Sequence, residues 1–371
     1  MAIKQFETRK SLVFKLKTRG LIDKEDRLAQ VLVEKNYYSL FNGLENLLLS
    51  CVKPKQYYGV TLEDFECLYS FDRALSGVIF SILNRLEEFL KTSIAYHFAK
   101  IHCSTLADTM QYTNKNKFMN PRDSNSQSPT YCPYSNNYPF AKAQNGKIIK
   151  DFNNFAFFDP AYLDKLIKHN DHIDSKFYQS PNYIAPKGVA IYHDKQKNKG
   201  RNIAVPLWVA IEALTFGELL RLLHYLQDDV LELVLNDFNL PKSKRSECLN
   251  MIDFLLYLRN SCAHGSLINR FTTPLYCKIN QNLVKSFKLT PKKHLKYQDS
   301  NLSLFDVLKI LSFFYSLMPL KKLFKNLIYA NHKRMGWKRG RELNQKLLAR
   351  MGCLDYKQWK ILFDGKNKFI L

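Results

Sequence analysis

Apolar side chains recur at every third or fourth position along residues 62–100, the longest patterned stretch of the chain. The recurring positions are Phe65, Leu68, Tyr69, Ala74, Leu75, Val78, Ile79, Ile82, Leu86, Phe89 and Leu90. This spacing aligns them on one face of an α-helix and leaves Arg73, Arg85, Glu88 and Lys91 on the opposite face, which we expect to be solvated. Gly77 interrupts the pattern and predicts a break in this long amphipathic helix.

Further helices are expected over residues 206–226, 243–263 and 304–329, where apolar residues show the same spacing. Gly217 predicts an interruption of the first of these. Near the start of the chain, residues 18–23 read as a turn into a helix with Asp23 as its N-cap. Neither alternating strands nor internal repeats are evident. The predicted fold class is therefore all-α, with at most minor β structure in the middle of the chain.

Composition divides the 371 residues into four segments. Residues 1–103 are predicted to form the N-terminal helical part, and residues 204–330 a helical core. Between them, residues 104–203 are rich in Asn, Ser, Pro, Tyr and Lys, with helical spacing only around 160–167. That composition predicts a polar, loop-rich insertion or a small subdomain. Residues 331–371 form a basic C-terminal tail.

The charge points to a polyanionic partner. Lys and Arg total 56 against 33 Asp and Glu, a formal net charge of +23, and such a surface attracts RNA or DNA. A basic protein with no nucleic-acid partner is the alternative. In the C-terminal segment, aromatic and basic residues are interleaved, as in surfaces that bind single-stranded nucleic acid. An ordinary solvated helix face is the other interpretation. The RNA-binding candidates here are Lys333, Arg334, Trp337, Lys338, Arg339 and Arg341.

Several classes of protein are disfavoured. The eight cysteines include no C-x-x-C pair, so structural zinc is not expected. The segments around His169, Asp171, His172 and His193–Asp194 hold scattered metal-ligand types, but no metal or cofactor is expected from them. The chain has no glycine-rich phosphate loop. With neither a signal peptide nor an 18-residue apolar run, we expect a cytoplasmic protein with free thiols and no membrane association.

Arg259, Asn260 and His264 form the candidate catalytic group at the end of the helix predicted for residues 243–263. Asn260 and His264 are four residues apart and share a helix face, and Gly265 supplies a C-terminal stop. A guanidinium can stabilise charge on a phosphate, and histidine can transfer protons near neutral pH. By spacing alone, His264 could equally be a cation placed at a helix C-terminus.

The segment Arg259–His264 resembles the Arg-polar-x-x-x-His motif of the HEPN superfamily of helical ribonucleases. The chain as a whole resembles the AbiD/AbiF group of abortive-infection proteins, because family-like segments occur in order from residue 18 to residue 264. These segments are Thr18–Leu21, Asn36–Tyr38, Leu68–Arg73, Leu86–Glu87, Pro206–Trp208, Ile211–Glu212, Phe216–Gly217 and Arg259–His264.

The resemblance implies an antiparallel helical bundle and an anti-phage defence protein that acts as a metal-independent endoribonuclease. Attack by the ribose 2′-hydroxyl would leave a 2′,3′-cyclic phosphate. In such enzymes two motifs face each other, and this chain has one, so a homodimer is implied, together with a non-coding RNA partner. A non-catalytic RNA scaffold and a protein-interaction or antitoxin-binding module remain alternatives.

Lys91 departs from the family pattern, which often has arginine four residues after the helix glutamate, here Glu87. Lysine keeps the charge but not the bidentate geometry. Lys91 is a further RNA-binding candidate. Glu87 and Glu212 lie on apolar helices, where they are interpreted as salt-bridge or packing residues or as support for the site.

Overall fold

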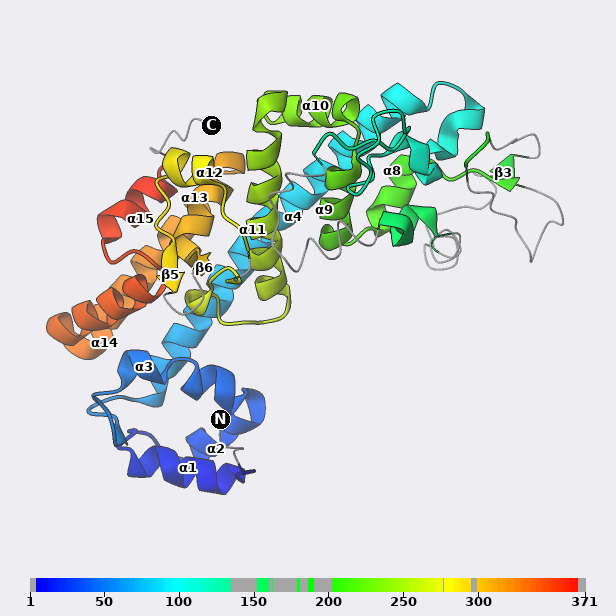
Figure 1. Cartoon of the computed structure of the whole chain (residues 1–371). Coiled ribbons are helices and arrows are strands. Elements are labelled where there is room, and N and C mark those ends of the chain that lie inside the picture. The colour runs from blue at the N-terminus through cyan, green and yellow to red at the C-terminus, as the bar shows by residue number, and fades with distance from the viewer. Residues whose placement is uncertain are drawn as a thin grey trace. The chain divides into compact units, whose positions relative to one another are not determined.

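The computed structural model describes residues 5–134, 152–159, 162, 179–180, 186–189, 202–275, 277–294 and 299–365. This part of the chain is mostly helical (Figure 1), which confirms the all-α prediction. Its strands form three short antiparallel pairs: β1 (Cys51–Val52) with β2 (Lys55–Gln56), β3 (Gln179–Ser180) with β4 (Asn202–Ile203), and β5 (Lys292–His294) with β6 (Asp299–Asn301). The β3–β4 pair lies within the predicted insertion, as expected, whereas the β1–β2 and β5–β6 pairs lie outside it.

The chain forms two compact units, each built from separate stretches of sequence. The first unit combines Met1–Ile82, Leu258–Thr272 and Leu302–Phe369. The second combines Leu83–Tyr257 with Thr273–Asn301 and the last two residues. Two helices, α4 and α11, contribute to both.

Helix α4 (Leu62–His102) is one continuous helix of 41 residues. The break predicted at Gly77 is wrong, because a single exposed glycine destabilises a helix by only about 1 kcal/mol. Thr61 precedes the first turn, and its backbone N–H donates to Asp64 Oδ2 at 2.9 Å. That bond satisfies the backbone donor of the residue that precedes the helix.

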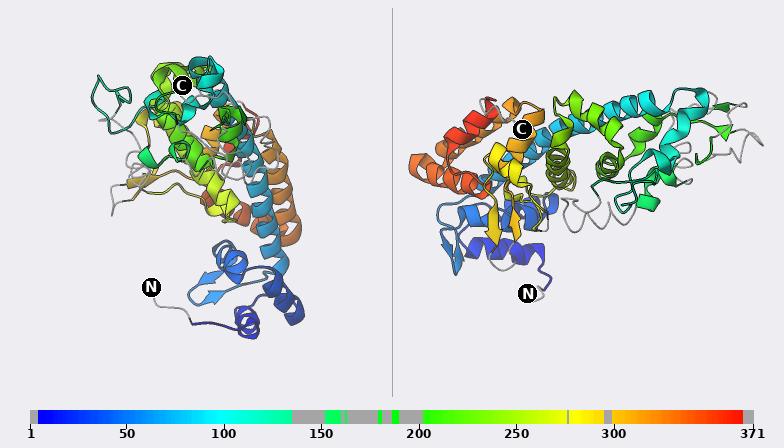
Figure 2. Two further views of the ribbon diagram at one scale, coloured as in Figure 1. Left: turned by 90° about the vertical axis from the view of Figure 1, so that its right-hand side faces the viewer. Right: turned by 45° about the horizontal axis from the view of Figure 1, so that its top comes forward.

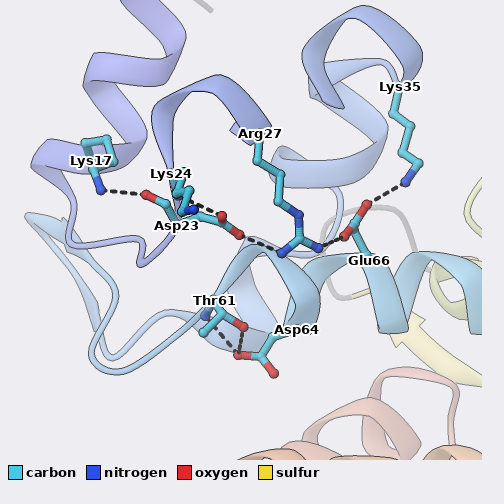
Figure 3. A network of polar contacts seen from close by, with 8 residues as sticks. All are labelled: Lys17, Asp23, Lys24, Arg27, Lys35, Thr61, Asp64 and Glu66. Carbon is cyan, nitrogen blue, oxygen red and sulfur yellow. Dashed lines mark hydrogen bonds and ion pairs between the residues drawn. The ribbon is translucent and has the colours of Figure 1, made fainter. Parts of the chain in front are cut away.

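The N-terminal elements pack together in the first unit: α1 (Arg9–Thr18), α2 (Glu25–Glu34), the π-helix η1 (Tyr38–Asn42) and α3 (Glu45–Leu48). Figure 3 shows ion pairs from Arg27 and Lys35 to the two carboxylate oxygens of Glu66, at 2.7 and 2.9 Å. These pairs connect α2 to α4. Asp23 is not the predicted N-cap, since α2 starts at Glu25 and Asp23 instead pairs with Arg27 at 3.2 Å.

The C-terminal part of the first unit contains α13 (Leu304–Phe314), α14 (Met318–Arg350) and α15 (Tyr356–Phe363), which pack together (Figures 1 and 2). The single helix predicted for residues 304–329 is wrong, because the chain leaves the helical conformation between Tyr315 and Leu317. Trp359 is fully buried, and its ring contacts Phe324 at 4.9 Å and Phe305 at 4.6 Å.

In the second unit the helices are α8 (Leu207–Ala210), α9 (Phe216–Tyr225), α10 (Asp228–Asp237), most of α11 (Arg245–Ala263) and α12 (Gln281–Ser286). Gly217 does not interrupt a helix as predicted, because it lies in the first turn of α9. The break falls at Leu214–Thr215, where Thr215 and Glu218 form a capping box. The Thr215 hydroxyl and the Glu218 carboxylate satisfy backbone donors and so stabilise a helix start at this position. Gly217 only weakens the helix in which it lies.

The described residues of the insertion include four 3-10 turns: η2 (Leu106–Thr113), η3 (Lys115–Lys117), η4 (Phe152–Asn154) and η5 (Ala156–Phe158). All but η3 carry a buried aromatic residue. Phe155 and Phe157 are buried, and the Phe155 ring lies 5.4 Å from that of Tyr225 on α9. The polar composition of this segment therefore conceals a small aromatic core. Most of the helical spacing predicted around residues 160–167 lies outside the described residues.

Neither α4 nor any other helix in the described ranges has an apolar stretch long enough to cross a lipid bilayer.

Candidate functional site

The C-terminal end of α11 carries the three predicted catalytic residues. Arg259 and Asn260 lie in its last turns, and His264 is the first residue beyond it. The Gly265 N–H donates to the Cys262 carbonyl at 3.2 Å and the Ser266 N–H to the Ser261 carbonyl at 3.1 Å. With φ of +66° at Gly265, this is a Schellman motif. The predicted glycine stop is confirmed, and it holds His264 at an exposed helix end.

Arg73 on α4 fixes the loop that follows His264. Its guanidinium donates to the carbonyl oxygens of Gly265 at 2.8 Å and Ser266 at 2.5 Å. The same guanidinium pairs with Asp72 at 2.6 Å and lies 5.4 Å from the Tyr69 ring centroid. The carbonyl oxygens of the two residues after His264 are therefore hydrogen-bonded to Arg73, whose guanidinium is itself oriented by Asp72 and Tyr69.

Asp72 is completely buried and receives three hydrogen bonds from the chain after the helix end. The backbone N–H groups of Ile268 and Asn269 donate to its carboxylate at 3.1 and 2.7 Å, and the Asn269 side chain donates at 2.7 Å. A buried carboxylate is stable when donors satisfy its oxygens. Here those donors set the path of the chain through η8 (Ile268–Arg270).

Arg350, at the end of α14, completes this buried network from the opposite side. Its guanidinium donates to Asn269 Oδ1 at 3.3 Å and to the Gly43 carbonyl at 3.1 Å. Burial and, to a smaller extent, nearby Arg270 lower the pKa of Arg350 to about 10, against the opposite effect of Asp72. Two arginines thus lie close together beside the helix end, which makes this region electropositive.

An open pocket of about 360 Å³ lies beside the same helix end. It is lined by Tyr38, Ser39, Ser261, Gly265, Ser266, Leu267, Arg270, Phe271 and Thr272. Tyr38 is 67% exposed and starts the π-helix η1, a conformation frequent at functional sites. Segments that are far apart in sequence, at residues 38–39 and 261–272, therefore meet around one surface hollow in the first unit.

None of the three predicted catalytic residues lines this hollow. His264 is exposed, and Asn260 is half-buried. The half-buried Arg259 guanidinium lies 5.6 Å from the Phe80 ring centroid. The pocket wall contains their neighbours Ser261, Gly265 and Ser266 instead.

Sequence reasoning overlooked Arg270 and Arg350. Nothing in the sequence singles out Arg270, because its importance arises from the pocket it lines. Arg350 belongs to a run of basic residues that looks uniform in sequence. The sequence did point to Asp72 and Arg73, because both belong to the family-like segment Leu68–Arg73.

Lys91 lies in the second unit and is 8% exposed. Its ammonium group pairs with Glu87 at 3.4 Å and with the Glu212 carboxylate at 3.7 Å, and it donates to the Glu212 carbonyl at 3.1 Å. These contacts agree with the salt-bridge interpretation of the two glutamates. In the structure the ammonium group of Lys91, which was predicted to contact RNA, is bound by these two glutamates.

The six candidates in the C-terminal segment all lie on α14, and they divide into two groups. Arg334 and Arg339 bond to other parts of the first unit. Lys333, Trp337, Lys338 and Arg341 are exposed.

Among the residues that the structure describes, no group of three His, Cys, Asp or Glu side chains is placed to hold a metal. The candidates His169, Asp171, His172, His193 and Asp194 lie outside the described residues.

The fold and this helix end define a class: a basic, mostly helical protein with an arginine- and histidine-bearing helix terminus held by a buried polar network. The model of a family described as Abi-like protein matches residues 30–269, more than half of the chain. The chain therefore belongs to the Abi-like family, whose proteins are of the abortive-infection type. No curated protein and no solved structure matches the chain.

Proposed function

We propose that this Abi-like protein is an endoribonuclease of the HEPN type, within the AbiD/AbiF group, and that it cleaves RNA without a metal ion. One observation carries the proposal. The exposed His264 lies at a helix end that the buried Asp72–Arg73–Asn269–Arg350 network holds in one conformation. A site that positions reacting groups needs such a rigid support.

The chemistry assigns a role to each residue. His264 accepts the proton of a ribose 2′-hydroxyl, whose oxygen attacks the adjacent phosphorus. The bond from phosphorus to the 5′-oxygen breaks, leaving a 2′,3′-cyclic phosphate and a 5′-hydroxyl that takes up a proton. Arg259 stabilises the charge on the phosphate, and Asn260 orients His264 or a phosphate oxygen. Arg270 at the pocket adds positive charge beside the site.

A second copy of the chain is part of the proposal, because the sequence contains a single Arg-x4-His motif. A homodimer would place two such motifs in one composite site. A structured non-coding RNA is the proposed partner, and the +23 charge supports a polyanionic ligand of this kind.

The test is cleavage of labelled RNA by the purified protein in EDTA, with the product ends analysed. His264→Ala is expected to lower the cleavage rate at least 100-fold, the scale of general acid–base catalysis. Arg259→Ala is expected to lower it similarly, because one transition-state contact is worth about two to three powers of ten. Arg122→Ala, which removes an exposed arginine in the second unit, is the control.

Cleavage that requires Mg²⁺ and leaves 3′-hydroxyl ends would overturn the mechanism. RNA that copurifies uncut, with His264→Ala behaving as wild type in growth-arrest and transcript assays, would instead identify a non-catalytic RNA scaffold. Absence of bound nucleic acid at low salt would favour a protein-interaction module.

A further inference from the structure

Helix α14 is a helical hairpin that turns at Gly336, where φ is +76°. Its two arms are in close contact, since a Cβ at Gly340 would lie 2.8 Å from the Asn331 carbonyl oxygen. The Asn331 side chain also donates to Asn344 Oδ1 at 2.6 Å, and both residues are buried. Backbone contact and a buried amide pair together make the hairpin a rigid element.

Two of its arginines fasten the hairpin to the rest of the first unit. Arg334 donates to Asp64 Oδ1 at 3.1 Å, at the start of α4. Arg339 donates to the carbonyl oxygens of Tyr58 and Gly59 at 2.8 and 3.2 Å. The hairpin tip is therefore held in place from both sides of the turn.

The outer face of the tip carries an aromatic platform. Trp337 is 74% exposed, and its ring stacks on His332 with centroids 4.3 Å apart and planes inclined by 19°. The histidine supports one face of the indole and leaves the other face accessible. An exposed, supported indole of this kind suits stacking against a flat ring.

Three cations lie within four residues of Trp337 in sequence: Lys333, Lys338 and Arg341 are exposed and make no hydrogen bond or ion pair within the ranges that the structure describes. An open pocket of about 420 Å³ adjoins the platform. The pocket is lined by Ile328, His332, Arg341, Asn344, Gln345, Leu348, Leu354, Asp355 and Tyr356. His332 and Arg341 thus belong to both the platform and the pocket.

We propose that the α14 hairpin tip is a binding site for unpaired nucleotides of single-stranded RNA. A base stacks on the free face of Trp337, Lys333 and Lys338 bind flanking phosphates, and Arg341 guides the next nucleotide into the pocket. The geometry favours RNA over a protein segment because it combines an accessible aromatic face with several cations that make no ion pair in the described part of the chain. The site shares only its ligand class with the proposed nuclease, and its binding is measurable without cleavage.

The experiment measures the affinity of a fluorescein-labelled oligouridylate for the full chain, in a His264→Ala background so that the probe stays intact. Trp337→Ala is expected to weaken binding about ten-fold, because stacking of one base contributes on that scale. Trp337→Phe keeps an aromatic face and should stay within about three-fold of the parent. Thermal unfolding verifies that each variant is folded.

The charge contribution is tested with the double variant Lys333→Ala/Lys338→Ala. Its matched control is Lys292→Ala/Lys293→Ala, which removes two exposed lysines from β5 in the second unit. We expect weaker binding from the first pair and little change from the second. Equal losses from both pairs would overturn the localisation.

Unchanged affinity in Trp337→Ala, or equal competition by duplex RNA of the same length, would show that no base stacks at this tip and would overturn the proposal. These outcomes are separate from the fate of the nuclease. The proposed catalysis can fail in the EDTA assay while stacking at Trp337 holds, and the reverse can also occur.

Discussion

Asp253 is an acid enclosed inside the second unit, in the middle of α11, with no exposed surface. Burial raises the pKa of Asp253 to about 8, and Asn250 acts in the opposite direction. Its carboxyl group is therefore protonated in the folded protein near neutral pH, whereas in the unfolded chain it ionises near pH 4.

This difference predicts a pH-dependent free energy of unfolding. Between about pH 4 and 8 the folded state binds more protons at this group than the unfolded state does. Its contribution to stability is thus full below pH 4 and falls with rising pH by at most ~1.4 kcal/mol per unit. Asp253→Asn removes that loss, so the variant is expected to be more stable than wild type at pH 8, with the gap closing toward pH 4.

Urea unfolding at several pH values measures this gap. Glu88→Gln, which neutralises an exposed acid on α4, is the control and should change stability by less than about 0.5 kcal/mol throughout. A gap between wild type and Asp253→Asn that does not vary with pH would contradict a buried, protonated Asp253.

The surroundings of a charged residue decide whether it is accessible to a ligand. Lys91, Arg334 and Lys338 are all cations in the sequence, but only Lys338 is exposed and available to a ligand. Lys91 is enclosed with two glutamates, and Arg334 is held by Asp64. Counting basic residues thus predicts the sign of the surface and not which residues make it up.

At the scale of elements, two glycines predict opposite effects of the same substitution. Gly265 ends α11 with φ of +66°, a conformation that alanine adopts at a cost of roughly 1–2 kcal/mol. Gly77 lies in α4, where an added Cβ would meet nothing within 4 Å. Gly265→Ala should therefore destabilise the protein by that amount, and Gly77→Ala should stabilise it by ~0.5–1 kcal/mol.

Thermal or urea unfolding measures the change in stability caused by each substitution, and RNA cleavage adds a second readout. Because Gly265 follows His264 directly, Gly265→Ala should also lower the cleavage rate, while Gly77→Ala should leave it unchanged. If the two substitutions shift stability in the same direction, the assigned backbone conformation at Gly265 is wrong.

Apolar spacing predicted α4 and α11 well, because apolar side chains are buried along both helices. Breaks were predicted less well. Gly77 and Gly217 both lie inside helices, whereas the chain breaks at Leu214–Thr215 and at Tyr315–Leu317. A glycine only weakens a helix, and the actual break depends on caps and on what the next segment packs against.

At the scale of the whole molecule, the net charge of +23 predicts RNA binding that weakens steeply with salt. Each phosphate neutralised releases counterions, so affinity for single-stranded RNA should fall linearly with salt on logarithmic axes. Lys333→Ala/Lys338→Ala should reduce that slope by up to ~1.4, about 0.7 per lost phosphate contact. Fluorescence titrations between 50 and 200 mM salt, roughly the range in which such slopes are resolved, measure it. A slope unchanged by the double substitution would place the phosphate contacts elsewhere.

The two compact units are discontinuous in sequence, and this bears directly on the candidate site. The Arg259–His264 segment belongs to the same unit as residues 1–82 and α14, although most of α11 belongs to the other. Division of the chain by composition follows sequence order and cannot reveal such an assembly.

By itself the sequence determined the helical class, the basic surface and the family-like segment at Arg259–His264, because spacing, charge and motif are local properties of a chain. Only the tertiary structure decided that Asp72 and Arg73 hold the loop after His264, that Arg350 reaches Asn269, and that Lys91 is enclosed. Those contacts join residues separated by up to 197 positions. Their energies depend on burial and on hydrogen-bond geometry, which exist only once the chain has folded.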